Sequence, residues 1–235
     1  MKRLSFAMIM FGLIAVFASA TGVNAATFEG SSSGIFTNPI GPGGMVTTGV
    51  GTNDFTWGTG ISAPSSRLTF TGVPVIATEP DTLFTFGNLY YYNGTIYAGT
   101  QADSVDLYVT VTLTSPFATI ENFTFPFQLI NTANTGDPNA SADYVNFVAI
   151  ANPAYFTYNG VDYSLQLLGF GNIVGGGFVG VNQFHVYEND YATADLIGRF
   201  TAKENINPIP EPGTMMLLGS GLVGLAGYGR RRFKV

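Results

Sequence analysis

A stretch near the middle of the chain alternates strictly between apolar and polar residues. Side chains on an extended strand point alternately to its two faces, so every second residue shares a face. One face of this strand would carry only apolar side chains: Val105, Leu107, Val109, Val111 and Leu113. Residues 26–207 show no helical periodicity of any length, and they contain period-two runs instead. The pattern therefore predicts an all-β domain.

Other segments repeat this pattern between turn-forming residues. Phe123 to Leu129 places three phenylalanines and a leucine on one face. Pro126 within it cannot donate to a ladder, so we expect this strand to lie at a sheet edge or to be bulged there. Asn159-Gly160, between Tyr155 and Leu168, predicts a two-residue hairpin turn. We expect further strands at 34–37, 54–58, 67–71, 83–87, 90–92, 145–150, 184–187 and 196–202. Many short strands of this kind favour an antiparallel β-sandwich of jelly-roll type.

The charge of residues 26–207 limits the partners of this domain. Only Arg67, Arg199 and Lys203 are basic there, whereas fourteen of the fifteen acidic residues of the chain fall in this range. Such a surface repels polyanions, so we expect neither nucleic acid nor anionic lipid as a ligand. The chain has no cysteine. Disulfides, thiolate metal sites and cysteine nucleophiles are therefore excluded.

The N-terminus has the pattern of a secretory signal peptide. Met1-Lys2-Arg3 is basic, Leu4 to Ala18 is an apolar run, and small residues follow. We expect export across the inner membrane and cleavage by signal peptidase after Ala25, with Ala20 as the alternative site. An uncleaved N-terminal anchor is the competing interpretation. Residues 1–25 are therefore set aside from the fold.

The C-terminus combines three further features. Three prolines between Pro208 and Pro212 predict a stiff, extended spacer. Met215 to Tyr228 has no charge over fourteen residues, and a helix of that length rises about 21 Å. That is short of a hydrocarbon core of roughly 30 Å unless neighbouring residues join it. Arg230, Arg231 and Arg232 suit a stop at the cytoplasmic face. A buried C-terminal helix of a soluble domain is the alternative. The predicted organisation is a signal peptide (1–25), a β-sandwich (26–207) and a terminal segment with one short transmembrane helix (208–235).

The terminal segment resembles a known sorting signal. Pro210-Glu211-Pro212, a Gly-rich apolar helix and an arginine cluster at the extreme C-terminus are similar to the PEP-CTERM signal of Gram-negative, exopolysaccharide-producing bacteria. The resemblance implies that exosortase, a membrane-embedded cysteine protease-transpeptidase, recognises the tripeptide. It also implies transient anchoring in the inner membrane, removal of the helix, and passage of the protein to the cell surface or extracellular matrix.

The body carries a second resemblance. Its short Gly- and Thr-rich motifs are similar in order and spacing to the choice-of-anchor K domain, a secreted module found with several anchors. The motifs are Gly34-Ile35-Phe36 and the segments 48–53, 55–58, 65–72, 84–96 and 131–135. This family supplies no catalytic residues.

Residues for catalysis are few. His185 is the single histidine of the chain, so a Ser-His-Asp triad would have to use it, and a histidine zinc site lacks further ligands. We expect His185 to be structural. Glycoside hydrolysis needs two converging carboxylates, and the spacing of the glutamates does not show convergence: Glu29, Glu79, Glu121, Glu188 and Glu204. We therefore expect no enzyme, and a glycoside hydrolase is the least favoured function.

One polar loop and one aromatic group are candidates for binding. The loop between Asn131 and Asp143 offers the carboxylate and amide oxygens that Ca²⁺ prefers, from Asn131, Asn134, Asp137, Asn139 and Asp143. The same residues are also common turn formers, so the loop could lack a metal. Trp57 and the run Tyr90 to Tyr92 could stack on sugars, or they could fill the core of the sandwich.

These observations predict an exported structural or interaction protein of the cell surface or of the extracellular polysaccharide matrix, without a required cofactor. The alternative is a lectin-like module whose binding depends on carbohydrate contacts or on Ca²⁺.

Overall fold

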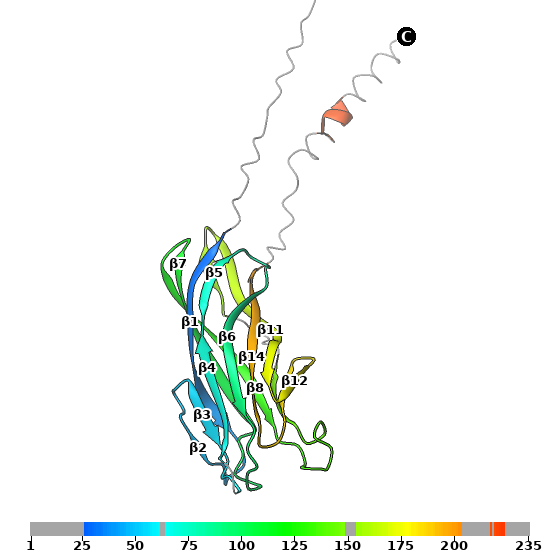
Figure 1. The fold of residues 1–235 in the computed structure, drawn as a ribbon. Coiled ribbons are helices and arrows are strands. Elements are labelled where there is room, and N and C mark those ends of the chain that lie inside the picture. The colour runs from blue at the N-terminus through cyan, green and yellow to red at the C-terminus, as the bar shows by residue number, and fades with distance from the viewer. Residues whose placement is uncertain (1–25, 62–63, 149–153, 204–216, 218, 224–235) are drawn as a thin grey trace, which may run out of the picture.

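The computed structural model describes residues 26–61, 64–148, 154–203, 217 and 219–223. This part of the chain forms two facing seven-stranded sheets with antiparallel pairing, named sheet A and sheet B here (Figure 1). The predicted all-β class and antiparallel sandwich are confirmed. The predicted signal peptide, 1–25, lies outside the described residues.

Sheet A has the strand order β12-β13-β9-β8-β7-β1-β5. Its strands are β12 (Gly177–Gly180), β13 (Gln183–Val186), β9 (Asp143–Phe147), β8 (Thr119–Ile130), β7 (Ser104–Ser115), β1 (Phe28–Ile40) and β5 (Pro74–Thr78).

Sheet B has the strand order β10-β11-β14-β6-β4-β3-β2. Its strands are β10 (Phe156–Tyr158), β11 (Val161–Gly175), β14 (Tyr191–Ala202), β6 (Phe84–Tyr92), β4 (Ser66–Gly72), β3 (Asp54–Trp57) and β2 (Thr47–Thr48).

Part of the predicted C-terminal helix lies within the described residues. Leu217 and residues 219–223 are helical and exposed. In the described part of the chain, no helix has the length and apolar character needed to cross a membrane. Most of the predicted span from Met215 to Tyr228 falls outside the described residues.

The strand pattern read from the sequence is confirmed at its clearest points. The alternate apolar side chains of β7 and β8 are buried. Asn159 and Gly160 join β10 to β11, with φ angles of 50° and 78°, as the predicted two-residue turn requires. The segments 83–87 and 90–92 form one strand, β6, rather than two. The short strands β2, β5 and β12 were not predicted.

The expectation for Pro126 is wrong. It lies in β8 between β7 and β9, opposite Asp106 and without a shift of register. Sheet A accommodates the proline because pairing with β9 starts only at Phe127. The Pro126 carbonyl accepts a hydrogen bond from the Val148 N–H at 3.3 Å, so the missing donor faces the place where the β9 ladder ends.

Aromatic side chains fill the space between the sheets. Phe55, Trp57 and Tyr91 form a stack, with ring centroids 5.6 and 5.7 Å apart. The Phe70 ring lies between the backbones of Gly34 in sheet A and Gly87 in sheet B. Each buried aromatic side chain of this kind contributes about 1.5–3 kcal/mol through its apolar area.

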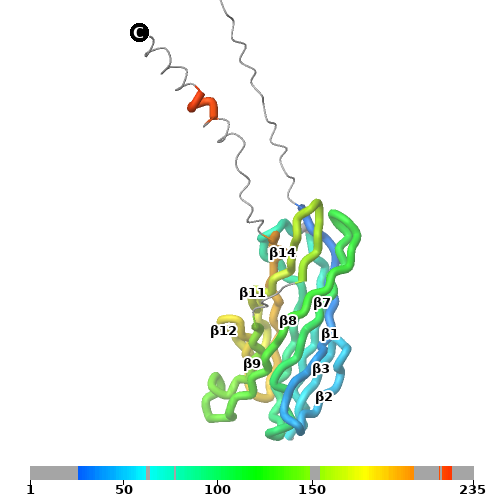
Figure 2. The backbone as a smooth tube through the Cα atoms, turned by 180° about the vertical axis from the view of Figure 1, so that it is seen from behind, coloured from blue at the N-terminus to red at the C-terminus, as the bar shows by residue number. Residues whose placement is uncertain are grey.

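The sandwich has two distinct ends. The described strands begin at Phe28 and finish at Ala202 at one end, called the terminal end (Figure 1). The opposite end, called the far end, holds Tyr92, Asp143 and Tyr191, and the loop 131–143 projects from it (Figure 2).

Candidate functional site

The loop that the sequence singled out for Ca²⁺ leaves β8 at Ile130 and enters β9 at Asp143. Several of its polar atoms serve the loop itself. Asp137 Oδ1 accepts from the Asn139 N–H at 2.9 Å, and the Ser141 hydroxyl donates to the Asp137 carbonyl at 2.9 Å. Asn139 Oδ1 accepts from the Tyr187 hydroxyl at 3.2 Å. Asp137 and Asn139 are therefore occupied in holding a turn, and Asn131 is exposed.

Asp143, at the end of this loop, points inward and is 4% exposed. Its Oδ1 accepts from the Thr132 N–H at 2.7 Å and from the Thr132 hydroxyl at 3.1 Å. Burial raises the pKa of Asp143 to about 7; the Thr132 bonds oppose this rise and the charge of Glu188 adds to it. Asp143 is therefore a carboxyl group poised to change charge near neutral pH.

Glu188, whose charge acts on Asp143, accepts hydrogen bonds from three other side chains. Its Oε1 accepts from Asn134 Nδ2 at 3.1 Å and from the Thr95 hydroxyl. Its Oε2 accepts from Asn93 Nδ2 at 3.3 Å. The charges of Asp143 and Glu188 also add to the rise that burial causes in the pKa of Tyr91. Three segments distant in the sequence thus meet at the far end: the loop 131–143, the turn after β6 and the turn before β14.

This meeting point contains two of the predicted binding residues, Asn134 and Asp143. Sequence reasoning did not place Asn93, Thr95 or Glu188 with them. The available signals were the polar groups Asn93-Gly94-Thr95 and Glu188-Asn189-Asp190, which interrupt the strand patterns. They could be read as turns, but their convergence depends on the strand order.

The aromatic residues divide between interior and surface. Trp57 is 4% exposed and Tyr91 is 2% exposed, so both lie in the core. Trp57 therefore does not lie on the surface, where a sugar-stacking platform would be. Tyr90 and Tyr92 lie on the outer face of sheet B, as the alternation of β6 predicts. Tyr90 stacks on Tyr191, with ring centroids 5.8 Å apart.

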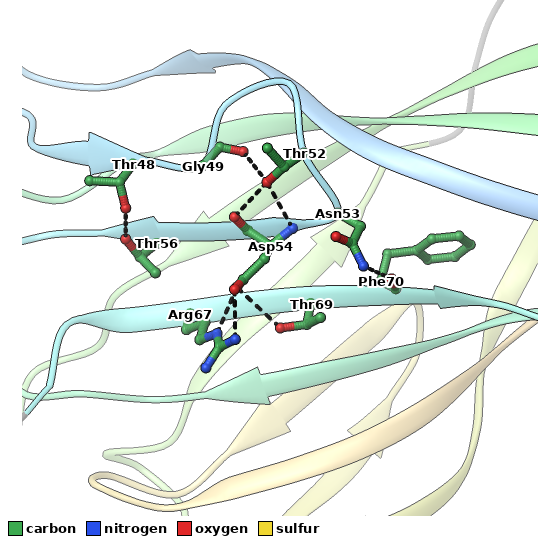
Figure 3. A network of polar contacts seen from close by, with 9 residues as sticks. All are labelled: Thr48, Gly49, Thr52, Asn53, Asp54, Thr56, Arg67, Thr69 and Phe70. Carbon is green, nitrogen blue, oxygen red and sulfur yellow. Dashed lines mark hydrogen bonds and ion pairs between the residues drawn. The ribbon is translucent and has the colours of Figure 1, made fainter.

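Polar side chains surround this tyrosine pair. Asp54 accepts two hydrogen bonds of 2.6 Å from Arg67, one at each carboxylate oxygen, and a third at 3.3 Å from the Thr69 hydroxyl (Figure 3). On the other side of β6, Asp195 accepts from Asn172 at 2.6 Å and from Asn88 at 3.2 Å. The outer face of sheet B thus presents an aromatic pair and two networks of hydrogen-bonding groups.

His185 lies on the outer face of sheet A. Its ring is stacked between those of Tyr144 and Phe178, with centroids 4.4 and 4.5 Å away. Nε2 lies 3.0 Å from Gln183 Oε1, and burial lowers the pKa of His185. These contacts give the imidazole a packing role.

A short serine-containing segment of β1 also has a structural role. Residues 30–34 read Gly-Ser-Ser-Ser-Gly, which matches the spacing of the nucleophile elbow of α/β-hydrolases. They lie within β1, where no strand-to-helix turn occurs. The Ser32 hydroxyl donates to the Phe86 carbonyl and accepts from the Val73 N–H at 3.0 Å. Ser32 therefore joins the two sheets.

The glutamates considered for hydrolysis are separated. Glu29, Glu79 and Glu121 lie toward the terminal end, on or next to β1, β5 and β8. Glu188 lies at the far end, and Glu204 is outside the described residues. Glu188 thus does not share a site with the other three.

The processing residues Pro210, Glu211 and Pro212 and the stop-transfer residues Arg230 to Arg232 also lie outside the described residues. Residues 208–232 match the PEP-CTERM protein-sorting motif. No curated protein matches the chain.

The PEP-CTERM motif identifies this chain as an exported protein that exosortase sorts to the cell surface. The match covers the predicted tripeptide and arginine cluster, so the predicted PEP-CTERM resemblance of this segment is confirmed. The likeness of residues 26–207 to the choice-of-anchor K domain stays a prediction, because the match covers only the C-terminal segment.

Proposed function

We propose that this protein is a non-catalytic module of the cell surface or extracellular matrix, which binds uncharged polysaccharide through the outer face of sheet B. The observation that carries the proposal is the stacked pair of Tyr90 and Tyr191 on that face. Flat aromatic rings can lie against the apolar faces of sugar rings, and nearby carboxylate, amide and guanidinium groups can bond their hydroxyls.

The arrangement around the tyrosine pair supports a long, flat ligand. Tyr191 is 55% exposed, and it pairs across the sheet with Tyr92, which in turn pairs with Arg67. Asp54 and Arg67 lie on β3 and β4, beyond Tyr90, whereas Asp195 lies on β14, the strand of Tyr191, further along it. A polysaccharide crossing the strands would therefore meet the hydrogen-bonding groups of Asp54 and Arg67 next to the stacking rings.

The charge of the domain supports an uncharged ligand. Fourteen acidic residues against three basic ones give residues 26–207 a negative field, which would repel acidic polysaccharides. The position of the chain ends adds to this picture. A tether at the terminal end leaves the outer face of sheet B and the far end free to face the matrix.

The side chains that a hydrolase would use are engaged in structural contacts, which supports a non-catalytic role. His185 is enclosed by two aromatic rings, and Ser32 is bonded between the sheets. Signal peptidase and exosortase would act on this chain as processing enzymes, with the inner membrane as a transient location. As a non-catalytic module, the protein requires no catalytic cofactor.

Affinity electrophoresis of the full chain, through gels containing neutral or acidic polysaccharides, tests the proposal. Retardation in a neutral polysaccharide is expected, and Tyr191→Ala should weaken it by up to about tenfold, because one aromatic stacking contact is worth roughly 0.5–1.5 kcal/mol. Tyr97→Ala is the matched control, since Tyr97 is also a tyrosine and is 54% exposed.

Equal loss of retardation in both variants would refute the role of this face. Absence of retardation in every polysaccharide would favour a purely structural protein. Release of reducing ends from a polysaccharide, abolished by a Glu→Gln substitution, would instead favour the hydrolase alternative.

A further inference from the structure

A buried side-chain oxygen lacks a partner at the far end. Asn93 directly follows β6 and is 0% exposed. Its Nδ2 donates to the Val186 carbonyl at 3.0 Å and to Glu188 Oε2 at 3.3 Å. Its Oδ1 has no hydrogen-bond partner among the described residues. An unpaired buried carbonyl oxygen costs about 1–3 kcal/mol, so a ligand that satisfies it would stabilise the fold.

A carboxylate from the other sheet approaches the same space. Asp143 pairs directly with Val186, the residue whose carbonyl Asn93 contacts, and both Asp143 and Asn93 are buried between the sheets. Asp143 Oδ1 accepts two hydrogen bonds from Thr132, one from its N–H and one from its hydroxyl. Among the described residues, no donor is found for its Oδ2. Asn93 therefore brings one buried unpaired oxygen to this end of the core, and Asp143 of sheet A brings a carboxylate.

Several acceptor oxygens gather around Glu188. The Thr95 hydroxyl contacts both Glu188 Oε1 and Asn189 Oδ1, the latter at 3.1 Å. One hydroxyl proton can serve only one of these two acceptors at a time. Asn134 adds its amide to the same carboxylate. The Thr95 N–H also donates to Asn189 Oδ1, at 3.3 Å. The group therefore gathers carboxylate and amide oxygens, which are the ligands that Ca²⁺ prefers.

We propose that Asp143, Glu188 and Asn93 bind one Ca²⁺ ion, which links sheet A to sheet B at the far end. Two carboxylates in a poorly solvated place repel each other, and a divalent cation would neutralise both. Ca²⁺ is favoured because it takes six to eight oxygen ligands in flexible geometry. The two carboxylates, the Asn93 carbonyl, the Asn134 carbonyl and water could supply them. Zn²⁺ would prefer histidine or cysteine ligands.

This site differs from the one predicted from the sequence. Of the five loop residues between Asn131 and Asp143, it uses Asp143 and Asn134. Asp137 and Asn139 remain in the turn that shapes the loop. The remaining protein ligands are Asn93, directly after β6, and Glu188, shortly before β14. The loop alone could not provide them.

Calcium titration of the full chain, purified in detergent and freed of metal with EDTA, tests this site by calorimetry and thermal unfolding. We expect saturable binding of one ion and, at about a hundred times the Kd, a rise in Tm of roughly 5–10 °C. Asp143→Asn and Glu188→Gln should each weaken binding by roughly tenfold or more. Glu121→Gln, near the terminal end, is the matched control and should bind as the wild type does.

A third variant, which adds a carboxylate, keeps the test informative if Asp143→Asn and Glu188→Gln fail to fold. Asn93→Asp supplies a third carboxylate at the unpaired oxygen, so it should tighten Ca²⁺ binding and lower Tm in EDTA. Absence of saturable heat at about 10 mM Ca²⁺, a range that covers even weak extracellular sites, would overturn the proposal. So would wild-type affinity in both Asp143→Asn and Glu188→Gln, or unchanged affinity in Asn93→Asp. Polysaccharide retardation is measured separately, so failure of one proposal is distinguishable from failure of the other.

Discussion

Phe28 of the first strand and Phe200 of the last strand pack against each other in the core, with ring centroids 4.8 Å apart. They come from different sheets, and both are 0% exposed. Phe156 and Tyr163 contact the same ring of Phe28. This aromatic cluster closes the terminal end. The described chain therefore begins and finishes at one end, and any tether acts there.

The aromatic cluster gives a prediction for stability. Phe200→Ala should lower the free energy of unfolding by about 3–5 kcal/mol, because it removes buried apolar area and leaves a cavity. Urea unfolding followed by the fluorescence of Trp57, the single tryptophan and a buried one, measures the loss. Ile120→Ala is the control, since Ile120 is 64% exposed on β8 and should change stability by about 0.5 kcal/mol or less. Similar losses in both variants would contradict the packing described.

The contact between Phe70 and Gly87 gives a second prediction. A Cβ on Gly87 would lie 2.2 Å from the nearest ring atom of Phe70, and that ring is held from the other side by Gly34. Gly87→Ala should therefore cost about 1–3 kcal/mol through overpacking. The free energy of unfolding is compared with that of Gly136→Ala, whose Cβ would meet no atom within 4 Å. A stabilised Gly87→Ala variant would show that the ring can move aside.

Asp143 should make stability depend on pH when Ca²⁺ is removed with EDTA. Its pKa is about 7 in the folded state against an ordinary 3.8, so the folded state keeps a proton that the unfolded state loses. This contribution is complete below about pH 4 and is lost as pH rises through about 7. Between about pH 5 and about pH 8 the wild type should lose roughly 2–3 kcal/mol relative to Asp143→Asn.

The comparison with Asp143→Asn isolates this group from His185. Burial lowers the pKa of His185 below 6.5, so His185 destabilises the fold as pH falls, which is the opposite direction. That effect is common to both proteins and cancels in the difference. Parallel stability curves for the two proteins across this range would show that Asp143 is ionised throughout.

The PEP-CTERM motif gives a prediction for processing. The mature surface protein should lack the segment after the tripeptide, because a Gly-rich run of fourteen residues is a weak permanent anchor: each glycine costs a helix about 1 kcal/mol relative to alanine. Intact-mass measurement on protein recovered from the cell envelope or medium checks this. Replacing Pro210, Glu211 and Pro212 with alanine should leave the tail attached, whereas Pro208→Ala should not. A full tail on most surface molecules, or normal cleavage of the triple variant, would refute it.

Much of the fold could be predicted because side-chain direction along a strand is a local property. The alternation in β7 and β8 identified the buried face of each strand, and Asn159-Gly160 identified a hairpin from two residues that tolerate positive φ. Pro126 was misjudged because its effect depends on where the neighbouring strand β9 ends. Trp57 and Tyr90 have similar chemistry, yet only strand pairing decides that one is buried and the other reaches the surface.

The sequence by itself determined the strand content, the acidic character of the domain and the C-terminal sorting motif, since each depends on residues close together in the chain. The tertiary structure alone decided the two candidate surfaces. Asn93 and Glu188 are 95 positions apart, and they meet because β6 ends where its antiparallel partner β14 begins. The stack of Tyr90 on Tyr191 has the same origin. Convergence of distant side chains depends on strand order and register, and a local pattern carries no information about either.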